Sequence, residues 1–183
     1  MGLKKQDMEE VFQSIYERRF LVEGLPETSS PADTHVQIFD NYIEATSLRL
    51  RKSRKPDNDE RIYLIEKVYY SEEDAEKRFG SAIALGRSEF ESLDNLKGRE
   101  TRKNRYQVSI EGVELAIDVF LGDLWGLNIA KIRFKTKKES QSFEPPGEFL
   151  LEVTADRFFL ENNLVDLKFE DIRNHLAQKK EAP

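Results

Sequence analysis

Apolar and charged residues alternate along several segments of this sequence, and this alternation constrains the fold more than any other feature. Successive side chains of a strand point to opposite faces. In segment 46–52, two leucines alternate with Arg49 and Arg51, so the arginines share one face. Lys131 and Arg133 share a face in the same way. The sequence therefore predicts strands that have one apolar face and one strongly charged face.

The same periodicity predicts about eight strands, joined mostly by short turns, at residues 15–22, 36–43, 46–52, 61–70, 105–111, 114–121, 128–135 and 149–154. This pattern is typical of a mainly β fold in which an antiparallel sheet meanders and can close into a barrel. Helices are expected at fewer places, namely residues 4–13, the segment after Ser71, Ser88–Leu96, the segment after Thr136 and the C-terminal segment that contains Phe169, Ile172 and Leu176.

Composition excludes several classes of function. The chain has 183 residues, a net charge of −6, two histidines and no cysteine. The size fits one domain, and the acidic balance disfavours a nucleic-acid partner. The absence of cysteine excludes disulfides and thiolate metal sites. No apolar run approaches the roughly 18 residues of a membrane span, and the N-terminus does not resemble a signal peptide, so we expect a cytoplasmic protein with no membrane partner.

A charged strand face allows two interpretations. It can be the solvated side of a half-buried sheet, or it can line the lumen of a barrel whose apolar face points outward. A lumen that holds several Arg and Lys side chains would be costly when empty, because like charges repel in a partly desolvated space. A phosphate-rich anion would relieve that repulsion, since Arg offers bidentate donors to phosphate oxygens and Lys offers a point charge.

The order of these segments resembles the CYTH domain, or triphosphate tunnel metalloenzyme family, from about Ile15 to Leu164. The matching stretches include IYERRFLV at 15–22, LRLRK at 48–52, LIEKV at 64–68, KNRY at 103–106, IDVFLGDLWGLNIAKIRF at 117–134 and EPPGEFLLEVTADRFFLENNL at 144–164. The resemblance implies an eight-stranded antiparallel tunnel at 14–165, with a helical extension at 1–13 and a helix and tail at 166–183. Bacterial members of this length mostly resemble inorganic triphosphatases.

The resemblance also implies roles for individual residues. Arg19 and Tyr42 occupy the positions that the family's triphosphatases assign to the reaction. Arginine cannot act as a base because its pKa lies far above neutral, whereas a tyrosine near arginines is expected to have a lowered pKa. The resemblance and the charged strand faces together suggest a set of basic residues that bind substrate. They are Arg49, Arg51, Lys67, Lys103, Arg105, Lys131 and Arg133. Strand parity, however, places Lys67 on the face of Tyr63 and Ile65.

Most of the carboxylates that would bind metal in the family are replaced in this sequence. The family's carboxylates would hold Mg²⁺ or Mn²⁺, and here only Glu17, Asp118 and Glu152 remain. The other carboxylate positions carry Ile15, Ala82, Ala84, Lys131 and Arg133. Mg²⁺ needs oxygen ligands, and nearby cations repel it. Two hypotheses stay open, which are a triphosphatase with a reduced metal site and a catalytically silent, metal-independent relative that binds a polyanion.

Overall fold

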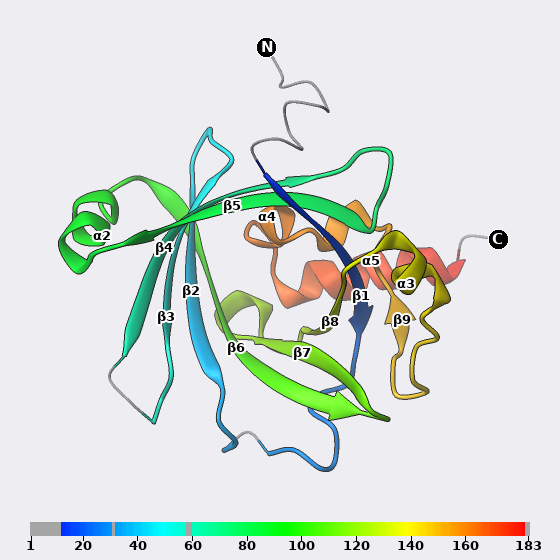
Figure 1. The fold of residues 1–183 in the computed structure, drawn as a ribbon. Coiled ribbons are helices and arrows are strands. Elements are labelled where there is room, and N and C mark those ends of the chain that lie inside the picture. Colours follow the sequence, from blue (N-terminus) through cyan, green and yellow to red (C-terminus); the bar gives the residue numbers. More distant parts are fainter. Residues whose placement is uncertain (1–11, 31, 58–59, 182–183) are drawn as a thin grey trace.

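The computed structural model describes residues 12–30, 32–57 and 60–181, and its strands close into a barrel (Figure 1). The strands are β1 (Gln13–Leu21), β2 (Val36–Ile43), β3 (Leu48–Arg54), β4 (Arg61–Tyr70), β5 (Lys77–Leu85), β6 (Gly98–Ile110), β7 (Val113–Phe120), β8 (Asn128–Phe134) and β9 (Leu151–Glu152). Their order is β5-β4-β3-β2-β6-β7-β8-β1-β9, and an added pairing of β5 with β1 closes the ring. The expected eight-stranded antiparallel barrel is confirmed, and β9 adds a short ninth strand.

Strand β1 closes the barrel because it pairs on both sides. Residues 16–21 pair with β8 along one edge. On the other edge, residues 13–16 pair with β5, and Phe20 and Leu21 pair with β9. Between these two pairings, the backbone N–H of Glu17 donates to the carbonyl of Glu76 at 2.8 Å. The backbone groups of β1 are thus used along its length, and the barrel leaves no open edge there.

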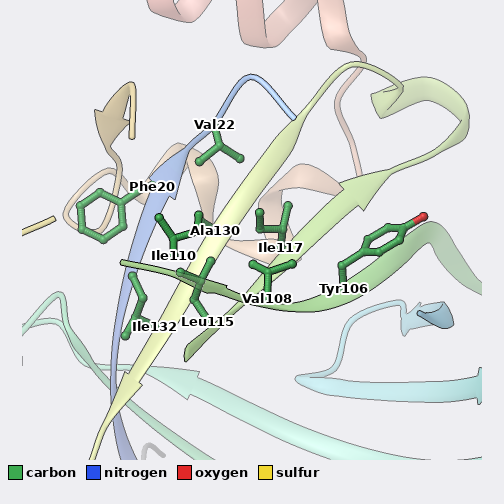
Figure 2. Close-up of a cluster of buried hydrophobic side chains, with 9 residues drawn as sticks. All are labelled: Phe20, Val22, Tyr106, Val108, Ile110, Leu115, Ile117, Ala130 and Ile132. Atoms are coloured by element: carbon green, nitrogen blue, oxygen red, sulfur yellow. The ribbon is translucent and has the colours of Figure 1, made fainter. Parts of the chain in front are cut away.

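The outer face of β1, β6, β7 and β8 is apolar. Figure 2 shows nine buried side chains from this face, among them Phe20, Ile117 and Ile132. Phe143 and Phe149, from the segment after β8, pack against this cluster. The barrel therefore places its main hydrophobic core outside the strands, which leaves the opposite strand face for polar groups.

A second apolar patch covers β3 and β4. Helix α2 (Arg87–Leu93) follows β5 directly and lies on the left in Figure 1. Its Phe90 packs with Leu50 and Ile43, so the leucine face of β3 is buried against α2. This contact directs Arg49 and Arg51 away from the helix and toward the lumen, as strand parity requires.

The C-terminal elements fill one end of the lumen. They are the 3₁₀ turn η2 (Arg157–Phe159), α4 (Glu161–Leu164) and α5 (Phe169–Glu181), and the short turn η1 (Gly122–Leu124) packs with them. Phe159 and Leu164 cluster with Phe120 and Ile129, whose strand parity places them on the lumen side. We call the segment Arg157–Leu164 the plug. Among the described helices, none is long and apolar enough to cross a membrane.

Several helix predictions are confirmed. Helix α5 contains Phe169, Ile172 and Leu176, as expected. Helix α3 (Lys137–Ser142) has the expected N-cap, in which the backbone N–H of Glu139 donates to the Thr136 hydroxyl at 3.2 Å. The expected helix at Ser88–Leu96 is α2, which begins at Arg87. Most of the helix expected at 4–13 lies outside the described residues; of the two that are described, residue 12 is not helical and residue 13 belongs to β1.

The helix predicted after Ser71 is wrong. The Ser71 hydroxyl accepts from the backbone N–H of Asp74, as in a helix cap, but the chain then turns back. The backbone N–H of Ser71 donates to the carbonyl of Lys77 at 3.0 Å, which closes the hairpin between β4 and β5. Strand pairing on both sides of β5 overrides the local preference for a helix. The strand predicted at 149–154 is also shorter, and only Leu151–Glu152 pairs.

Leu164 tests how much the plug contributes to stability. It is fully buried, and replacement of a buried leucine by alanine costs about 2–5 kcal/mol. We expect Leu164→Ala to lower the free energy of unfolding by that amount in urea titrations. The matched control is Leu96→Ala, because Leu96 is 43% exposed. Equal stability of the two variants would contradict the packing of the plug.

Candidate anion-binding tunnel

The lumen is lined by charged side chains that alternate with the outer apolar ones. Most of the predicted basic residues lie on this inner face, and they come from β1, β3, β6 and β8. They are Arg19, Arg49, Arg51, Lys103, Arg105, Lys131 and Arg133. The structure therefore favours the lumen interpretation of the charged faces over the solvated sheet.

Asp118 is the central acid of the inner lumen. Its side chain is fully buried, and its Oδ2 atom lies 3.0 Å from Lys103 Nζ and 2.9 Å from Lys131 Nζ. Arg105 donates to both carboxylate oxygens, at 2.6 and 2.8 Å. Burial alone would raise the pKa of Asp118, but these three cations outweigh it and hold the pKa well below its usual range. Asp118 is therefore ionised at neutral pH.

Glu161 supplies the second carboxylate of the inner lumen, and it comes from the plug. Its Oε2 atom accepts from Arg49 Nη1 at 2.6 Å. Its Oε1 atom accepts from the ammonium groups of Lys103 and Lys131. Burial opposes the charge of Glu161, yet the surrounding cations hold its pKa well below the usual range.

Further ion pairs inside the lumen join neighbouring strands. Arg51 donates to both oxygens of Asp40, at 2.7 and 2.8 Å. Glu66 on β4 lies 2.8 Å from Arg49 Nη2 and 3.4 Å from Arg51 Nε. These pairs fix the arginine side chains of β3 in place, because each guanidinium is held by more than one acceptor.

Glu17 lies nearer the mouth of the tunnel and has looser partners. Its Oε2 atom lies 3.3 Å from both Arg78 and Arg133. Burial opposes its charge, but Arg78, Lys131 and Arg133 lower the pKa of Glu17 below its ordinary value.

A cavity of about 540 Å³ opens at this mouth. Four arginines line it together with one acid, Glu66. The arginines are Arg51, Arg78, Arg105 and Arg133. The mouth therefore concentrates positive charge in a space large enough for a small anion.

Two buried guanidinium groups have unused donors. Arg19 Nη1 and Arg78 Nε find no hydrogen-bond partner among the described residues. Arg19 is held from the other side, since its Nη2 donates to the Thr154 carbonyl at 2.6 Å and its guanidinium lies over the Tyr70 ring. Because an unsatisfied buried donor is costly, these atoms favour an anionic ligand in the tunnel.

The structure corrects the prediction for Lys67. Lys67 lies on the outer face of β4, where its ammonium group packs over the Tyr69 ring at 5.3 Å. The parity of Lys67 with Tyr63 and Ile65 was the correct guide, and the motif match was not. Glu66 takes the lumen position of that strand.

The predicted metal ligands are not brought together. Glu152 lies on β9 and accepts from Arg18 at 2.8 and 2.6 Å, on the outer face of β1 and away from Asp118. Asp118 and Glu17 each face cations. Within the part of the chain that the structure describes, no group of three or more acidic or histidine side chains could hold a metal ion. As arranged, these residues do not fit Mg²⁺ or Mn²⁺, because every candidate carboxylate is already neutralised by Arg or Lys.

Tyr42 lies in the lumen, where its hydroxyl accepts from Arg49 Nη1 at 3.0 Å. The lowered pKa expected for Tyr42 is wrong. Burial is the largest influence and raises the pKa well above its ordinary value, and the carboxylates Glu161 and Asp40 add to that effect against Arg49. A phenol that stays protonated can donate or accept a hydrogen bond, but it is a poor general base.

Several lumen residues were not found from the sequence. Asp40 and Glu66 share strand faces with Tyr42 and Leu64, so parity alone could have placed them. Arg78 was missed because periodicity did not mark its strand, β5, and the resemblance placed only Ala82 and Ala84 on a strand there. Glu161 gave no signal, because its approach to Arg49 spans 112 residues of sequence and depends on the plug.

Another cavity, of about 590 Å³, lies outside the barrel between the segment after β1 and the end of β6. Its lining includes apolar residues and four acids, which are Glu23, Glu27, Glu111 and Glu148. Negative charge of this density disfavours a phosphate ligand. The basic mouth of the barrel is therefore the candidate anion site.

Comparison with known proteins supports the fold. No model of a protein family matches the chain, and no curated protein matches it. A crystal structure described as that of the hypothetical protein NE1496 is 25% identical, covers 82% of this chain and 97% of its own, and has a TM-score of 0.55. A second structure, described as the inorganic triphosphatase NE1496, is 24% identical over 82% of this chain and 93% of its own, also with a TM-score of 0.55.

These similarities agree with the motifs and the closed barrel. The chain has a CYTH-like barrel fold, and its low identity marks it as a divergent form. The comparisons address the fold, whereas the roles of Arg19, Tyr42 and the other lumen residues stay predictions.

Asp118 allows a test of the ion network through pH. A carboxyl whose folded pKa is depressed adds stability that is fully present above its unfolded pKa, about 3.9, and is lost as pH falls through the folded pKa. Removal of one partner of a buried pair costs about 3–5 kcal/mol. We expect Asp118→Asn to lose about that much in urea unfolding at pH 7, and to lose less further stability than the wild type between pH 4 and pH 2. Parallel pH profiles would contradict the network.

Proposed function

We propose that the tunnel binds triphosphate or another phosphate-rich small anion at its mouth, and that binding does not require a metal ion. The observation that carries this proposal is the cavity of about 540 Å³ that Arg51, Arg78, Arg105 and Arg133 line together. Arginine offers several N–H donors in a planar fork that suits phosphate oxygens. The unused donor of Arg78 lies in the same group.

The ion pairs of the lumen leave donors for a ligand. Arg51 and Arg105 each use Nε and Nη2 for a carboxylate. Each guanidinium has five N–H donors, so each keeps others for a phosphate oxygen. The carboxylates hold the side chains rigid, which lowers the entropy lost on binding. A polyanion would therefore meet preorganised charge.

Hydrolysis of triphosphate is the second candidate. It is favoured by the similarity to the structure described as the inorganic triphosphatase NE1496. Three features weigh against it here. The carboxylates are paired with cations, Arg19 cannot serve as a base, and burial raises the pKa of Tyr42. The metal-independent binder is therefore the better supported function.

The partner of this chain would be a small anion. The net charge of −6 disfavours extended contact with nucleic acid. The positive charge is instead concentrated in the tunnel mouth, where small phosphate-rich anions fit. A cytoplasmic location, where such anions are common, stays a prediction.

Arg133 gives the cleanest test of the mouth, since its side chain is 53% exposed and it has one loose acidic partner, Glu17. A hydrogen bond between charged groups contributes about 1.5–3 kcal/mol. We expect Arg133→Ala to weaken triphosphate binding by about tenfold or more in calorimetry, with little change in stability. Arg87→Ala is the matched control, because Arg87 lies on α2 and is 74% exposed. Equal affinities of the two variants would remove the mouth from the site.

Metal dependence separates the two candidate functions. Ligand that binds only the folded state raises the melting temperature by mass action. We expect triphosphate to raise the melting temperature in EDTA, and the shift to shrink as salt rises, because the attraction is Coulombic. Phosphate release is measured alongside with Mg²⁺, Mn²⁺ or EDTA. Stabilisation that needs a divalent ion, together with metal-dependent release, would favour the hydrolase instead.

A further inference from the structure

Glu161 differs from the other acids of the lumen in its origin. Asp40, Glu66 and Asp118 lie on barrel strands and pair with arginines of neighbouring strands. Glu161 instead belongs to the plug and enters the lumen from one end. It brings a negative charge that the barrel wall itself does not supply.

Three cations converge on this one carboxylate. Arg49, Lys103 and Lys131 come from β3, β6 and β8, and each has a nitrogen within hydrogen-bonding distance of a Glu161 oxygen. Donors that reach one anion from three sides are the arrangement that also suits a phosphoryl group, whose oxygens accept from several directions. The Glu161 carboxylate therefore stands where a phosphoryl group could be bound.

A second cavity borders Glu161. A smaller cavity of about 140 Å³ is lined by Tyr42, Arg49, Tyr70 and Glu161, among others. Val68 lines both this cavity and the mouth cavity. The two spaces thus lie next to each other at Val68 on β4, and Glu161 lies on the far side of that residue from the mouth arginines.

We infer that Glu161 is a built-in anion that occupies an inner phosphate subsite and so limits the length of the phosphate chain that the tunnel accepts. This inference rests on the proposed function. In it, the mouth arginines bind the ligand, whereas Glu161 determines how deep the ligand can reach. Glu161 is thus a specificity residue, and a longer polyphosphate gains nothing from Lys103 and Lys131 in the wild type.

The position of Glu161 is fixed. Its neighbours Phe159, Leu160 and Leu164 are buried, and Phe159 and Leu164 belong to the apolar cluster at the end of the barrel. A side chain on such an anchored turn blocks the subsite permanently and does not swing away like a lid. Length selection should therefore be present at every ligand concentration.

Calorimetry in EDTA with pyrophosphate, triphosphate and tetraphosphate tests the inference, using the wild type, Glu161→Gln and Glu161→Ala. In the wild type, we expect affinities for triphosphate and tetraphosphate that agree within about threefold, because the inner cations are already occupied. In both variants, we expect the ratio of tetraphosphate to pyrophosphate affinity to rise about tenfold or more, since three cations are released for the ligand. Glu170→Gln, an exposed change of the same charge on α5, should leave the ratio unchanged.

The outcomes separate this inference from the proposed function. Binding by the wild type with an unchanged ratio in Glu161→Gln would overturn the role of Glu161 and leave the proposed function standing. A wild-type affinity that climbs more than tenfold from triphosphate to tetraphosphate would overturn it as well, and that measurement requires no folded variant. If neither the wild type nor any variant binds, both proposals fail. Binding by the Glu161 variants alone would overturn both the proposed function of the wild type and the length limit, because Glu161 would then close the tunnel completely.

Discussion

The fold depends on the neutralisation of buried charge inside the barrel. Lys103 and Lys131 are removed from water, and each buried ion costs several kcal/mol unless partners repay it. Asp118 from the wall and Glu161 from the plug supply that compensation. The apolar residues are then free to pack on the outside, against α2 and the segments around Phe143 and Phe149. The charged lumen and the outward-facing core are thus two sides of the same alternation along each strand.

That alternation is local, so much of the barrel could be predicted from the sequence. Leu48 to Arg51 show it most clearly, since four residues define both faces of β3. The periodicity did not predict strand β5, because KRFGSAIAL has little charge at its end and follows an acidic segment that caps a turn. The strand exists because β4 and β1 need a partner on each side. Its pairing with β4 is a local hairpin, but its pairing with β1 joins segments far apart in sequence, and no local pattern records that second pairing.

The candidate site was predictable to the same degree. Parity located Arg49, Arg51, Lys131 and Arg133, while a motif match misplaced Lys67. The sequence also showed that cations replace acids at positions 131 and 133, but not what would balance them. Those balancing groups include Glu161, whose contacts span at least 30 residues of sequence. This replacement removes two carboxylates and adds two cations, which disfavours a divalent ion in the lumen.

The positions of β1 and the plug in the sequence also impose an order on folding. The closing strand β1 must pair with β8, more than a hundred residues later, before a ring exists. The plug can enter the lumen only after that ring has formed or as it forms. Contacts this distant in sequence slow folding, since the entropy of a large loop is lost before the contact is gained. Until Glu161 arrives, Arg49, Lys103 and Lys131 face solvent with less opposing charge, so dissolved polyanions would be able to compete with the plug and delay the final step.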